Sequence, residues 1–322
     1  MVKLSGKDFI TIHDLTAADL DEIFTLAADL KTKQKNGLKH EYLWAKSLAM
    51  LFEKPSTRTR VSFEIGMWQL GGLAINLDQE AVGLGTRESI PDVARTLSRF
   101  ADAILIRTFA HAKVLELAQY ATVPVINALS DLHHPCQALA DIFTIMEQKA
   151  HSNGQPQGLS LHDLKMAYVG DGNNNVCHSL MQAAAKVGLN LTVASPKGYE
   201  PDAAIIKDVF ADAAATGAEI NILNDPVIAA KNADVIYTDV WVSMGQEKEK
   251  ANKLKAFSQF QVNDELVKLA KPDYIFMHCL PAHRGEEVTN EVIESPNSVV
   301  FNQAENRLHA QKAVLTLLLG GL

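Results

Sequence analysis

Short apolar runs alternate along this chain with longer segments in which apolar residues recur at helical spacing. Apolar runs of about five residues, bounded by polar residues or glycine, are typical of buried strands. They predict strands at residues 47–52, 73–77, 103–107, 123–128, 165–169, 190–194, 219–223, 235–239, 274–278 and 299–302. The segments between them predict helices at residues 60–70, 89–100, 111–118, 135–148 and 176–187. Strands that alternate with helices indicate an α/β fold, with doubly wound parallel sheets covered by helices on both faces.

The clearest break in this pattern lies at residues 149–163, where glycines and a proline accompany polar residues. The chain has 322 residues, which is more than one hydrophobic core usually holds. A boundary at the break leaves four or more predicted strands on each side. We therefore expect two α/β domains linked by helices, residues 1–150 and residues 151–303. The apolar pattern after about residue 304 predicts a final helix that could pack on either domain.

Composition narrows the class of protein. The net charge of -8 argues against non-specific nucleic-acid binding, which depends on neutralising phosphates. Three widely spaced cysteines do not form a disulfide framework, so free thiols in a reducing, cytoplasmic compartment are expected. The first eleven residues contain no apolar run, so no signal peptide is expected. No apolar stretch reaches the length of a membrane span, so no membrane partner is expected either.

Hydroxyl residues and cations gather after the first predicted strand, in the segment Lys54-Pro55-Ser56-Thr57-Arg58-Thr59-Arg60. The helix predicted next adds backbone N–H groups and the positive end of its dipole. A helix cap requires one hydroxyl, whereas this segment has three together with three cations. The surplus of donors indicates a site for a phosphate group. Arg307, near the start of the last predicted helix, could reach back to the same anion or remain a surface charge.

Two further polar clusters follow strands of the first half. Arg107 ends one predicted strand, and His134 and Gln137 lie where the helix at 135–148 begins. A guanidinium, a neutral imidazole and an amide can all donate to a polarised carbonyl oxygen. A surface ion pair for Arg107 and a structural cap at the helix start remain alternatives. A zinc site made of His133, His134 and Cys136 has the wrong ligand spacing.

Polar residues also follow three predicted strands of the second half. The turn Gly170-Asp171-Gly172-Asn173-Asn174-Asn175 resembles a dinucleotide fingerprint that lacks its third glycine. Its amides could instead bind an amino-acid head group, or simply cap the next helix. Asp239 ends a strand and could hold an ammonium group, and a mobile loop is expected after it. His278 and Cys279 leave open a Cys–His nucleophile. A zinc site is also conceivable, made of His278, Cys279 and His283.

Taken together, these segments resemble the aspartate/ornithine transcarbamylase family. Ser56-Thr57-Arg58-Thr59-Arg60 matches the family's carbamoyl-phosphate signature. His134-Pro135-Cys136-Gln137 and His278-Cys279-Leu280-Pro281 match two further motifs in the expected order. Asp239-Val240-Trp241-Val242-Ser243-Met244-Gly245 resembles the loop with which ornithine-using members bind their amine. The resemblance runs from about Lys46 to the end of the chain.

The resemblance implies roles for particular residues. It implies a carbamoyl-phosphate site made of Ser56, Thr57, Arg58, Thr59, Arg107, His134, Gln137, Arg307 and the Leu280 carbonyl. It implies an ornithine site made of Asn175, Asp239, Ser243 and Met244, with Cys279 near the reacting amine. Arg107 and Cys279 would be the catalytic residues, and neither a metal nor another cofactor is implied. The last helix would return to the first domain, and the chains would form homotrimers or assemblies of trimers.

The expected reaction is a direct attack of a neutral amine on the carbamoyl carbon, with phosphate leaving. In the family, the loop at residues 79–85 approaches a neighbour's active site, but here it lacks the polar residue expected near Gly83, so the resemblance does not establish this contact between subunits. A transcarbamylase that uses putrescine, aspartate or an acylated ornithine is the nearest alternative. An NAD-binding dehydrogenase built on the turn at residues 170–175, or a catalytically inactive homologue, would belong to another class.

Overall fold

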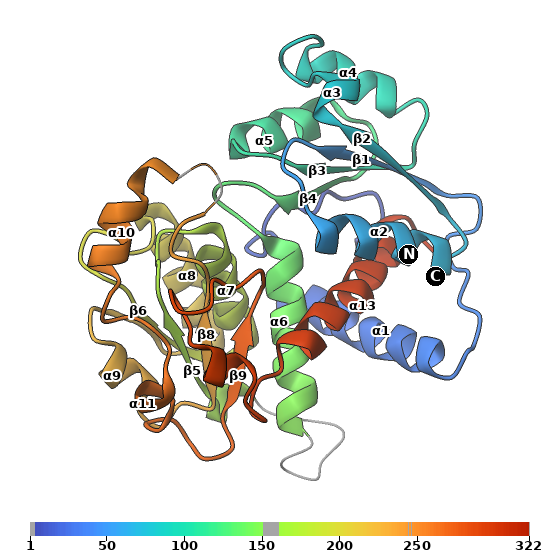
Figure 1. Ribbon diagram of the computed structural model, residues 1–322. Helices are drawn as coiled ribbons and strands as arrows, with labels where there is room; N and C mark the ends of the chain where they lie inside the picture. The colour runs from blue at the N-terminus through green and yellow to red at the C-terminus, as the bar shows by residue number, and fades with distance from the viewer. Residues whose placement is uncertain (1–3, 151–160, 244, 246, 322) are drawn as a thin grey trace. The chain divides into compact units, whose positions relative to one another are not determined.

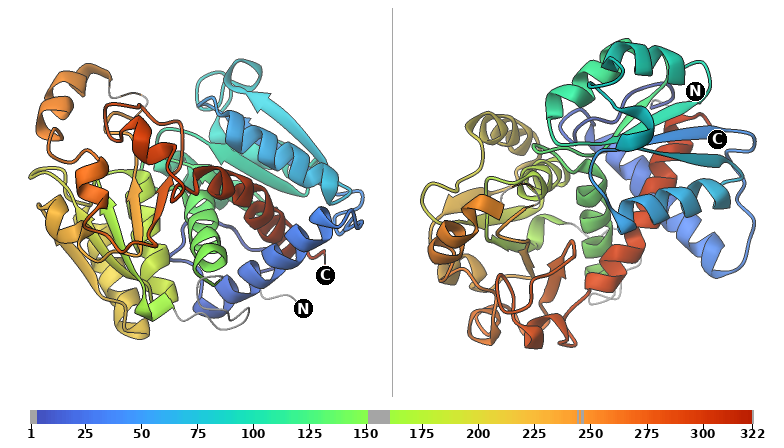
Figure 2. Two further views of the ribbon diagram at one scale, coloured as in Figure 1. Left: turned by 60° about the horizontal axis from the view of Figure 1, so that its bottom comes forward. Right: turned by 45° about the horizontal axis from the view of Figure 1, so that its top comes forward.

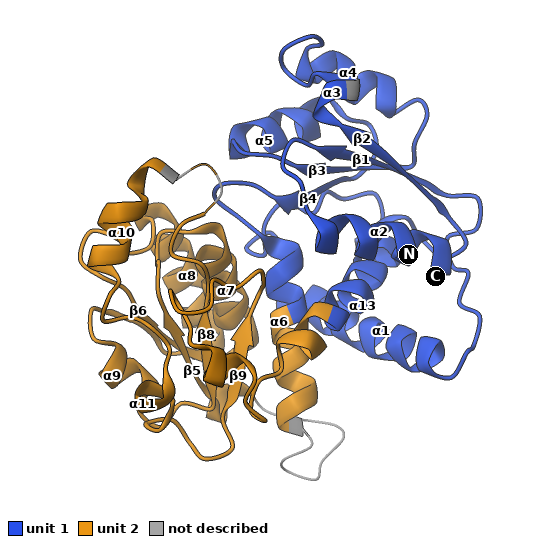
Figure 3. Ribbon diagram, in the orientation of Figure 1, with its two compact units in different colours: residues 1–140, 305–322 blue, residues 141–304 orange. Residues whose placement is uncertain are grey.

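The computed structural model describes residues 4–150, 161–243, 245 and 247–321 (Figures 1 and 2). The chain divides into two compact units, which Figure 3 shows in different colours. Unit 1 comprises residues 1–140 and 305–322, and unit 2 comprises residues 141–304. The division falls ten residues before the predicted boundary at 150, and it lies inside helix α6 (Pro135–Ala150). The helical pattern runs unbroken up to residue 150, so the sequence alone gave no sign of a division at residue 140.

Unit 1 is built around a parallel sheet of four strands in the order β2-β1-β3-β4. The strands are β1 (Ser47–Phe52), β2 (Leu73–Asp78), β3 (Ala103–Arg107) and β4 (Val125–Leu129). The helices are α1 (Ala17–Lys35), α2 (Thr57–Gln69), α3 (Gln79–Val82), α4 (Ile90–Leu97) and α5 (His111–Tyr120), with the start of α6 and most of α13 (Val300–Leu318). Strands β1, β3 and β4 are buried almost throughout, which explains their nearly continuous apolar sequences.

Unit 2 holds a second parallel sheet, of five strands in the order β7-β6-β5-β8-β9. The strands are β5 (Lys165–Val169), β6 (Asn190–Ala194), β7 (Ile220–Leu223), β8 (Val235–Thr238) and β9 (Ile275–His278). The α-helices are α7 (Asn175–Val187), α8 (Ala203–Thr216), α9 (Pro226–Ala230), α10 (Lys250–Ala256), α11 (Asp264–Val267) and α12 (Asn290–Ile293), with 3₁₀ turns at Leu161–Asp163 and Glu247–Glu249.

Each sheet has a point at which the strand order reverses. In unit 1 the chain moves from β1 outward to β2 and then returns to the other side of β1 as β3. In unit 2 it moves from β5 through β6 to β7 and returns as β8. Ligands of such sheets bind in the crevice beside the carboxyl ends of these strands. The ligand-binding residues are therefore expected directly after β1 and β3 in unit 1, and directly after β5 and β8 in unit 2.

The predicted α/β fold with two parallel sheets is confirmed, and nine of the ten predicted strands are present with ends shifted by at most two residues. The strand predicted at 299–302 is wrong, because α13 begins at Val300. A short apolar run does not distinguish a strand from the buried start of a helix. Helix α1 was not predicted, although Thr16 and Asp19 form a capping box at its start.

None of the helices in the described part of the chain combines the length and the apolar composition that a membrane span requires.

Candidate functional site

The predicted phosphate segment forms the first turn of helix α2. Ser56 is the N-cap of this helix, and its hydroxyl accepts a hydrogen bond of 3.2 Å from the Thr59 N–H. The helix begins at Thr57, three residues earlier than predicted, so Thr57, Arg58 and Thr59 all lie in the first turn. The N–H groups of a first turn lack helical partners and favour an anion. Three members of the signature therefore present side chains at an anion-binding helix end.

Two arginines from distant parts of unit 1 converge on Thr59. The Thr59 hydroxyl oxygen accepts from Arg107 at 3.5 Å and from Arg307 at 3.3 Å. Arg307 also donates to the Gln137 side-chain oxygen at 2.7 Å. All four side chains are buried, with Arg107 the most exposed at 6%. Charge-assisted hydrogen bonds hold these guanidinium groups in place, with their positive charge beside the first turn of α2.

His134 lies in the same positively charged environment. Burial lowers the pKa of His134 well below its ordinary value, and the Arg307, Arg107 and Arg58 guanidinium groups lower this pKa further. The imidazole is therefore neutral near pH 7 and can donate one N–H. Burial raises the pKa of the neighbouring Cys136 thiol to about 12. Because a thiolate is the reactive form, Cys136 is not a nucleophile at neutral pH.

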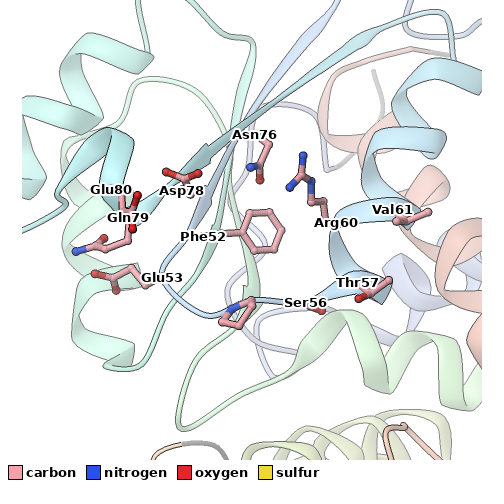
Figure 4. A pocket seen from close by; sticks show the side chains of 11 residues that line it. Phe52, Glu53, Ser56, Thr57, Arg60, Val61, Asn76, Asp78, Gln79 and Glu80 are labelled. Atoms are coloured by element: carbon pink, nitrogen blue, oxygen red, sulfur yellow. The ribbon is translucent and has the colours of Figure 1, made fainter.

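A cavity of about 720 Å³ opens beside the phosphate turn. It is lined by Phe52, Glu53, Pro55, Ser56, Thr57, Arg60, Val61, Asn76, Asp78, Gln79 and Glu80. In the view of Figure 4, Phe52 lies between the acidic side chains on one side and Arg60 on the other. Ser56 and Thr57 thus face both this cavity and the anion-binding helix end. A volume of this size accommodates a small ligand or a protein side chain.

The second cluster lies in unit 2, where β8 and β9 end side by side. The Cys279 thiol donates to the Asp239 carboxylate at 3.0 Å. Asp239 is only 5% exposed, and burial raises the pKa of its carboxyl group, while His278 and the thiol oppose that shift. A buried carboxylate next to a thiol can hold an ammonium group. Ser243 follows in the same loop and is half-buried.

His278 connects this cluster to a buried glutamate. Its Nδ1 accepts the Leu280 N–H at 2.9 Å, so in the neutral ring Nε2 carries the proton and donates to Glu287 Oε1 at 3.2 Å. His278 and Glu287 are both fully buried. Glu287 was missed in the sequence, because a glutamate nine residues after a strand carries no signal of its own. Asp239, His278 and Glu287, which are buried, thus form a series of titratable groups with the half-buried Cys279.

The glycine turn after β5 is closed by its own chain. Asn174 caps helix α7: its Oδ1 accepts from the Cys177 N–H at 2.8 Å, and its Nδ2 donates to the Tyr168 hydroxyl at 2.9 Å. A side chain at Gly172 would lie 2.8 Å from the Tyr199 carbonyl oxygen. Gly172 is therefore required by the approach of the chain itself. In a dinucleotide fold, the corresponding glycine admits a pyrophosphate, so this packing disfavours the dehydrogenase alternative.

A buried ion pair fixes the same turn to helix α10. Lys253 Nζ lies 2.6 Å from Asp171 Oδ2, and both side chains are at most 3% exposed. Burial raises the pKa of Asp171, and Lys253 opposes this shift. Helix α10 follows the loop that carries Ser243, so the pair joins two of the loops with predicted ornithine contacts. This pair too was not predicted.

Replacing Lys253 with methionine is expected to destabilise the protein by roughly 3–5 kcal/mol, because Asp171 would remain buried without its partner charge. Urea unfolding followed by circular dichroism measures the loss. The double variant Lys253→Met/Asp171→Asn should recover most of it, because no buried charge remains. Equal stability of the wild type and the single variant would show that the pair does not hold the turn.

The structure places the remaining predicted residues as follows. Asn175 is the first residue of α7 and is half-buried. Leu280 belongs to unit 2 and has a φ of +56°. The contact of its carbonyl group with the carbamoyl group stays a prediction. Met244 lies outside the described residues. Within the described part of the chain, neither of the two zinc sites considered from the sequence brings its ligand atoms together. His278 and Cys279 lie close to Asp239, whereas His283 lies close to Glu286 and Glu287.

Comparisons with known proteins agree along the whole chain. The carbamoyl-phosphate-binding domain of aspartate/ornithine carbamoyltransferases matches residues 7–147, and their Asp/Orn binding domain matches residues 162–318. The ornithine carbamoyltransferase of Thermococcus kodakarensis is 57% identical over 322 residues, covering 100% of this chain and 99% of the relative. The relative from Pyrococcus furiosus named "Ornithine carbamoyltransferase, anabolic" is 56% identical, covering 100% of this chain and 99% of its own.

Two solved structures show the same similarity in three dimensions. The ornithine carbamoyltransferase of Pyrococcus furiosus superposes with a TM-score of 0.94 at 56% identity, covering 100% of both chains. That of Gloeobacter violaceus superposes with a TM-score of 0.85 at 45% identity, covering 98% of this chain and 99% of that one.

Proposed function

This chain belongs to the aspartate/ornithine carbamoyltransferase family, and we propose on that premise how its residues carry out carbamoyl transfer. The enzyme transfers the carbamoyl group of carbamoyl phosphate to the side-chain amine of L-ornithine, giving L-citrulline and phosphate. The observation that carries the assignment of residues is the convergence of Arg107 and Arg307 on Thr59, at the start of helix α2.

Carbamoyl phosphate binds to unit 1. Its phosphate oxygens accept from the hydroxyl groups of the first turn of α2, from the N–H groups of that turn and from Arg58. Arg107, His134 and Gln137 donate to the carbamoyl oxygen, and Arg307 holds Gln137 in position. A neutral imidazole donates to the oxygen without adding another charge to a site that already contains three guanidinium groups. As negative charge develops on the oxygens, these fixed donors stabilise it.

Ornithine binds to unit 2. Asn175, Ser243 and Met244 hold its amino-acid head group, and Asp239 pairs with its α-ammonium group. The two amide contacts of Asn174 support Asn175 as the ligand, because Asn174 already caps the helix and bonds to Tyr168. Cys279 lies beside the Asp239 carboxylate and marks where the reacting amine is held.

The attacking amine must lose a proton before it can react. An alkyl ammonium has a pKa near 10.4, so deprotonation at pH 7 costs roughly 4–5 kcal/mol. Like-charge repulsion in a positively charged site lowers this cost. The series of Asp239, Cys279, His278 and Glu287 offers acceptors for the released proton. None of these steps requires a covalent enzyme intermediate.

The two domains take different substrates in this proposal. Residues 1–150, with the C-terminal helix at about 304–322, form the carbamoyl-phosphate domain, and residues 151–303 form the ornithine domain. The observed division of the chain into units at residues 140 and 304 supports this assignment.

We propose further that the enzyme is a homotrimer or an assembly of trimers. Val61, Ile65 and Trp68 lie on one face of α2 and are 50%, 41% and 72% exposed. Leu73 and Ile75 are similarly exposed on the adjacent edge strand β2. Exposed apolar side chains gathered on a helix and an edge strand are typical of a protein interface. Light scattering should therefore give the mass of a trimer or a multiple of it, and a monomer mass would contradict the proposal.

The cellular location is proposed as cytoplasmic. Cys136, Cys177 and Cys279 are all free thiols, as is typical of a reducing compartment. Detection of the enzyme mainly in a membrane or extracellular fraction would contradict this assignment.

Steady-state kinetics tests the reaction itself. Citrulline formation from carbamoyl phosphate and ornithine should exceed carbamoylation of putrescine, aspartate or N-acetylornithine by orders of magnitude in kcat/KM. A higher kcat/KM for one of those amines would replace ornithine with that substrate. Binding of NADH, followed by its fluorescence, would revive the dehydrogenase alternative.

Arg58 and Arg60 provide a matched pair for testing the phosphate turn. The variant Arg58→Ala is expected to lose roughly 10- to 150-fold in kcat/KM for carbamoyl phosphate, the worth of one charge-assisted hydrogen bond. Arg60→Ala should change it little, because Arg60 is exposed and paired with Glu64 at 3.0 Å. Equal losses in both variants would indicate a general effect of positive charge and not a phosphate contact.

A further inference from the structure

A second group of possible metal ligands lies in the turn after β9. His283, Glu286 and Glu287 each offer one ligand atom, and these three atoms lie within 4.8 Å of one another. The imidazole nitrogen is 3.7 Å from the Glu286 oxygen and 3.9 Å from the Glu287 oxygen. None of these three side chains was assigned a contact with either substrate. They come from five consecutive residues, so the turn itself brings them together.

Two carboxylate oxygens of this group are buried and lack donors. Glu287 is fully buried, and its Oε1 is used twice, by the His283 N–H at 2.6 Å and by His278 at 3.2 Å. Its Oε2 accepts no hydrogen bond from any described residue, and the same holds for Glu286 Oε2. A buried carboxylate oxygen without a donor destabilises the fold, because its interaction with water is lost and not replaced. Both oxygens face the imidazole nitrogen, so a cation between the three atoms would satisfy all of them.

The turn is held in place by contacts that do not use these ligand atoms. The Glu286 N–H donates to the His283 carbonyl at 2.8 Å, and Gln261 Nε2 donates to the carbonyls of Gly285 and Glu286. Lys250 pairs with Glu286 through Oε1, at 2.9 Å, and leaves Oε2 facing the other ligands. His283 is 46% exposed in its side chain, which provides access from solvent.

We propose that His283, Glu286 and Glu287 bind a first-row divalent cation such as Zn²⁺ or Co²⁺, with water completing its coordination. One imidazole and two carboxylates are a donor set that such ions accept. Ligand atoms at about 2.1 Å from a tetrahedral ion lie about 3.4 Å apart, so the 3.7 and 3.9 Å distances from His283 Nδ1 to the two carboxylate oxygens would shorten by a few tenths of an ångström on binding. The two glutamates supply the negative charge, and the half-exposed Lys250 offsets only part of it.

The proposed site shares Glu287 with the ornithine cluster, which we define as Asp239, His278, Cys279 and Glu287. One oxygen of Glu287 pairs with His278, and the other would bind the cation. A bound cation would pull on the carboxylate that accepts the hydrogen bond from His278 and so disturb the position of this ring. Cation binding is therefore expected to slow citrulline formation. This regulatory consequence rests on the proposed function, whereas the binding of the ion does not.

Cobalt titration of the full-length enzyme distinguishes this site from the neighbouring one. The group Asp239, His278 and Cys279 could also hold a metal, but a cobalt–thiolate bond gives an intense charge-transfer band in the near ultraviolet. The proposed site contains only nitrogen and oxygen ligands, so it should give weak visible bands without that feature. His283→Gln and Glu286→Gln should each weaken cobalt binding by about tenfold or more. His162→Gln, which changes an exposed histidine elsewhere in unit 2, should leave binding unchanged.

The outcomes separate the two parts of the proposal. Absence of cobalt binding at millimolar concentration, or unchanged affinity in both glutamine variants, would overturn the site. A thiolate band that Cys279→Ser removes together with all binding would place the ion at the ornithine cluster instead. Inhibition by cobalt in the wild type but not in His283→Gln would support the regulatory consequence. Stoichiometric binding with unchanged turnover would overturn that consequence alone. The binding assay does not depend on citrulline formation, so its failure would leave the proposed reaction standing.

Discussion

Replacing Arg107 with alanine is expected to lower kcat/KM for carbamoyl phosphate by about 100- to 1,000-fold, the effect of removing one donor to a developing oxyanion. Arg107 ends strand β3, at the point where the strand order of the first sheet reverses. Its guanidinium group is 6% exposed and donates to Thr59. In this buried position, water screens the charge of the guanidinium group only weakly. Removing that charge therefore raises the free energy of the transition state by a large amount.

The measurement is the initial rate of citrulline formation at subsaturating carbamoyl phosphate and saturating ornithine. Arg107→Lys should recover only part of the activity, because lysine keeps the charge but cannot donate through two directed N–H groups. Arg95→Ala is a suitable control, since Arg95 is an exposed arginine of the same unit. Circular dichroism checks that each variant is folded. Retention of more than about a tenth of the activity by a folded Arg107→Ala variant would contradict the catalytic role.

Replacing Asp239 with asparagine is expected to raise the ornithine KM and to lower kcat/KM for ornithine by roughly 30-fold to a few thousand-fold. This range corresponds to the 2–5 kcal/mol that is lost when one partner of a buried charge pair is removed. Asparagine keeps the shape of the side chain but not its charge, so the substrate ammonium would be buried without a counter-charge. Asp239 is buried beside the Cys279 thiol, so little water is present to compensate for the lost charge.

Kinetics with each substrate varied in turn would locate the effect. The KM for carbamoyl phosphate should change little in Asp239→Asn, because the side chains proposed to bind carbamoyl phosphate belong to unit 1. Asp264→Asn, which changes an exposed aspartate of the same unit, should behave as the wild type. Unchanged ornithine kinetics in Asp239→Asn would refute its role, and an equal rise in both KM values would indicate a general disturbance of the fold.

Local sequence was sufficient to predict nine strands of the fold and the polar turn that opens α2, although helix α1 was missed. The apolar runs of β1, β3 and β5 are buried on both faces, so their composition alone distinguishes them from their surroundings. The first turn of α2 is also a local structure, because Ser56 caps the helix through a residue only three positions away. The residues that follow the strands were found by the topology rule for parallel sheets, which needs only the order of the elements.

The partners of these residues were decided by the tertiary structure alone. Arg307 reaches Thr59 across 248 positions and Gln137 across 170 positions, and nothing in the sequence near Arg307 distinguishes it from a surface charge. Glu287 and the Lys253–Asp171 pair likewise gain their meaning only from burial and from neighbours that the fold brings to them. Helix propensity and apolar periodicity act over a few residues, so the sequence by itself determined most of the elements and the capped first turn of α2. The pairing of charges inside each unit depends on packing between distant segments, and only the folded chain decides it.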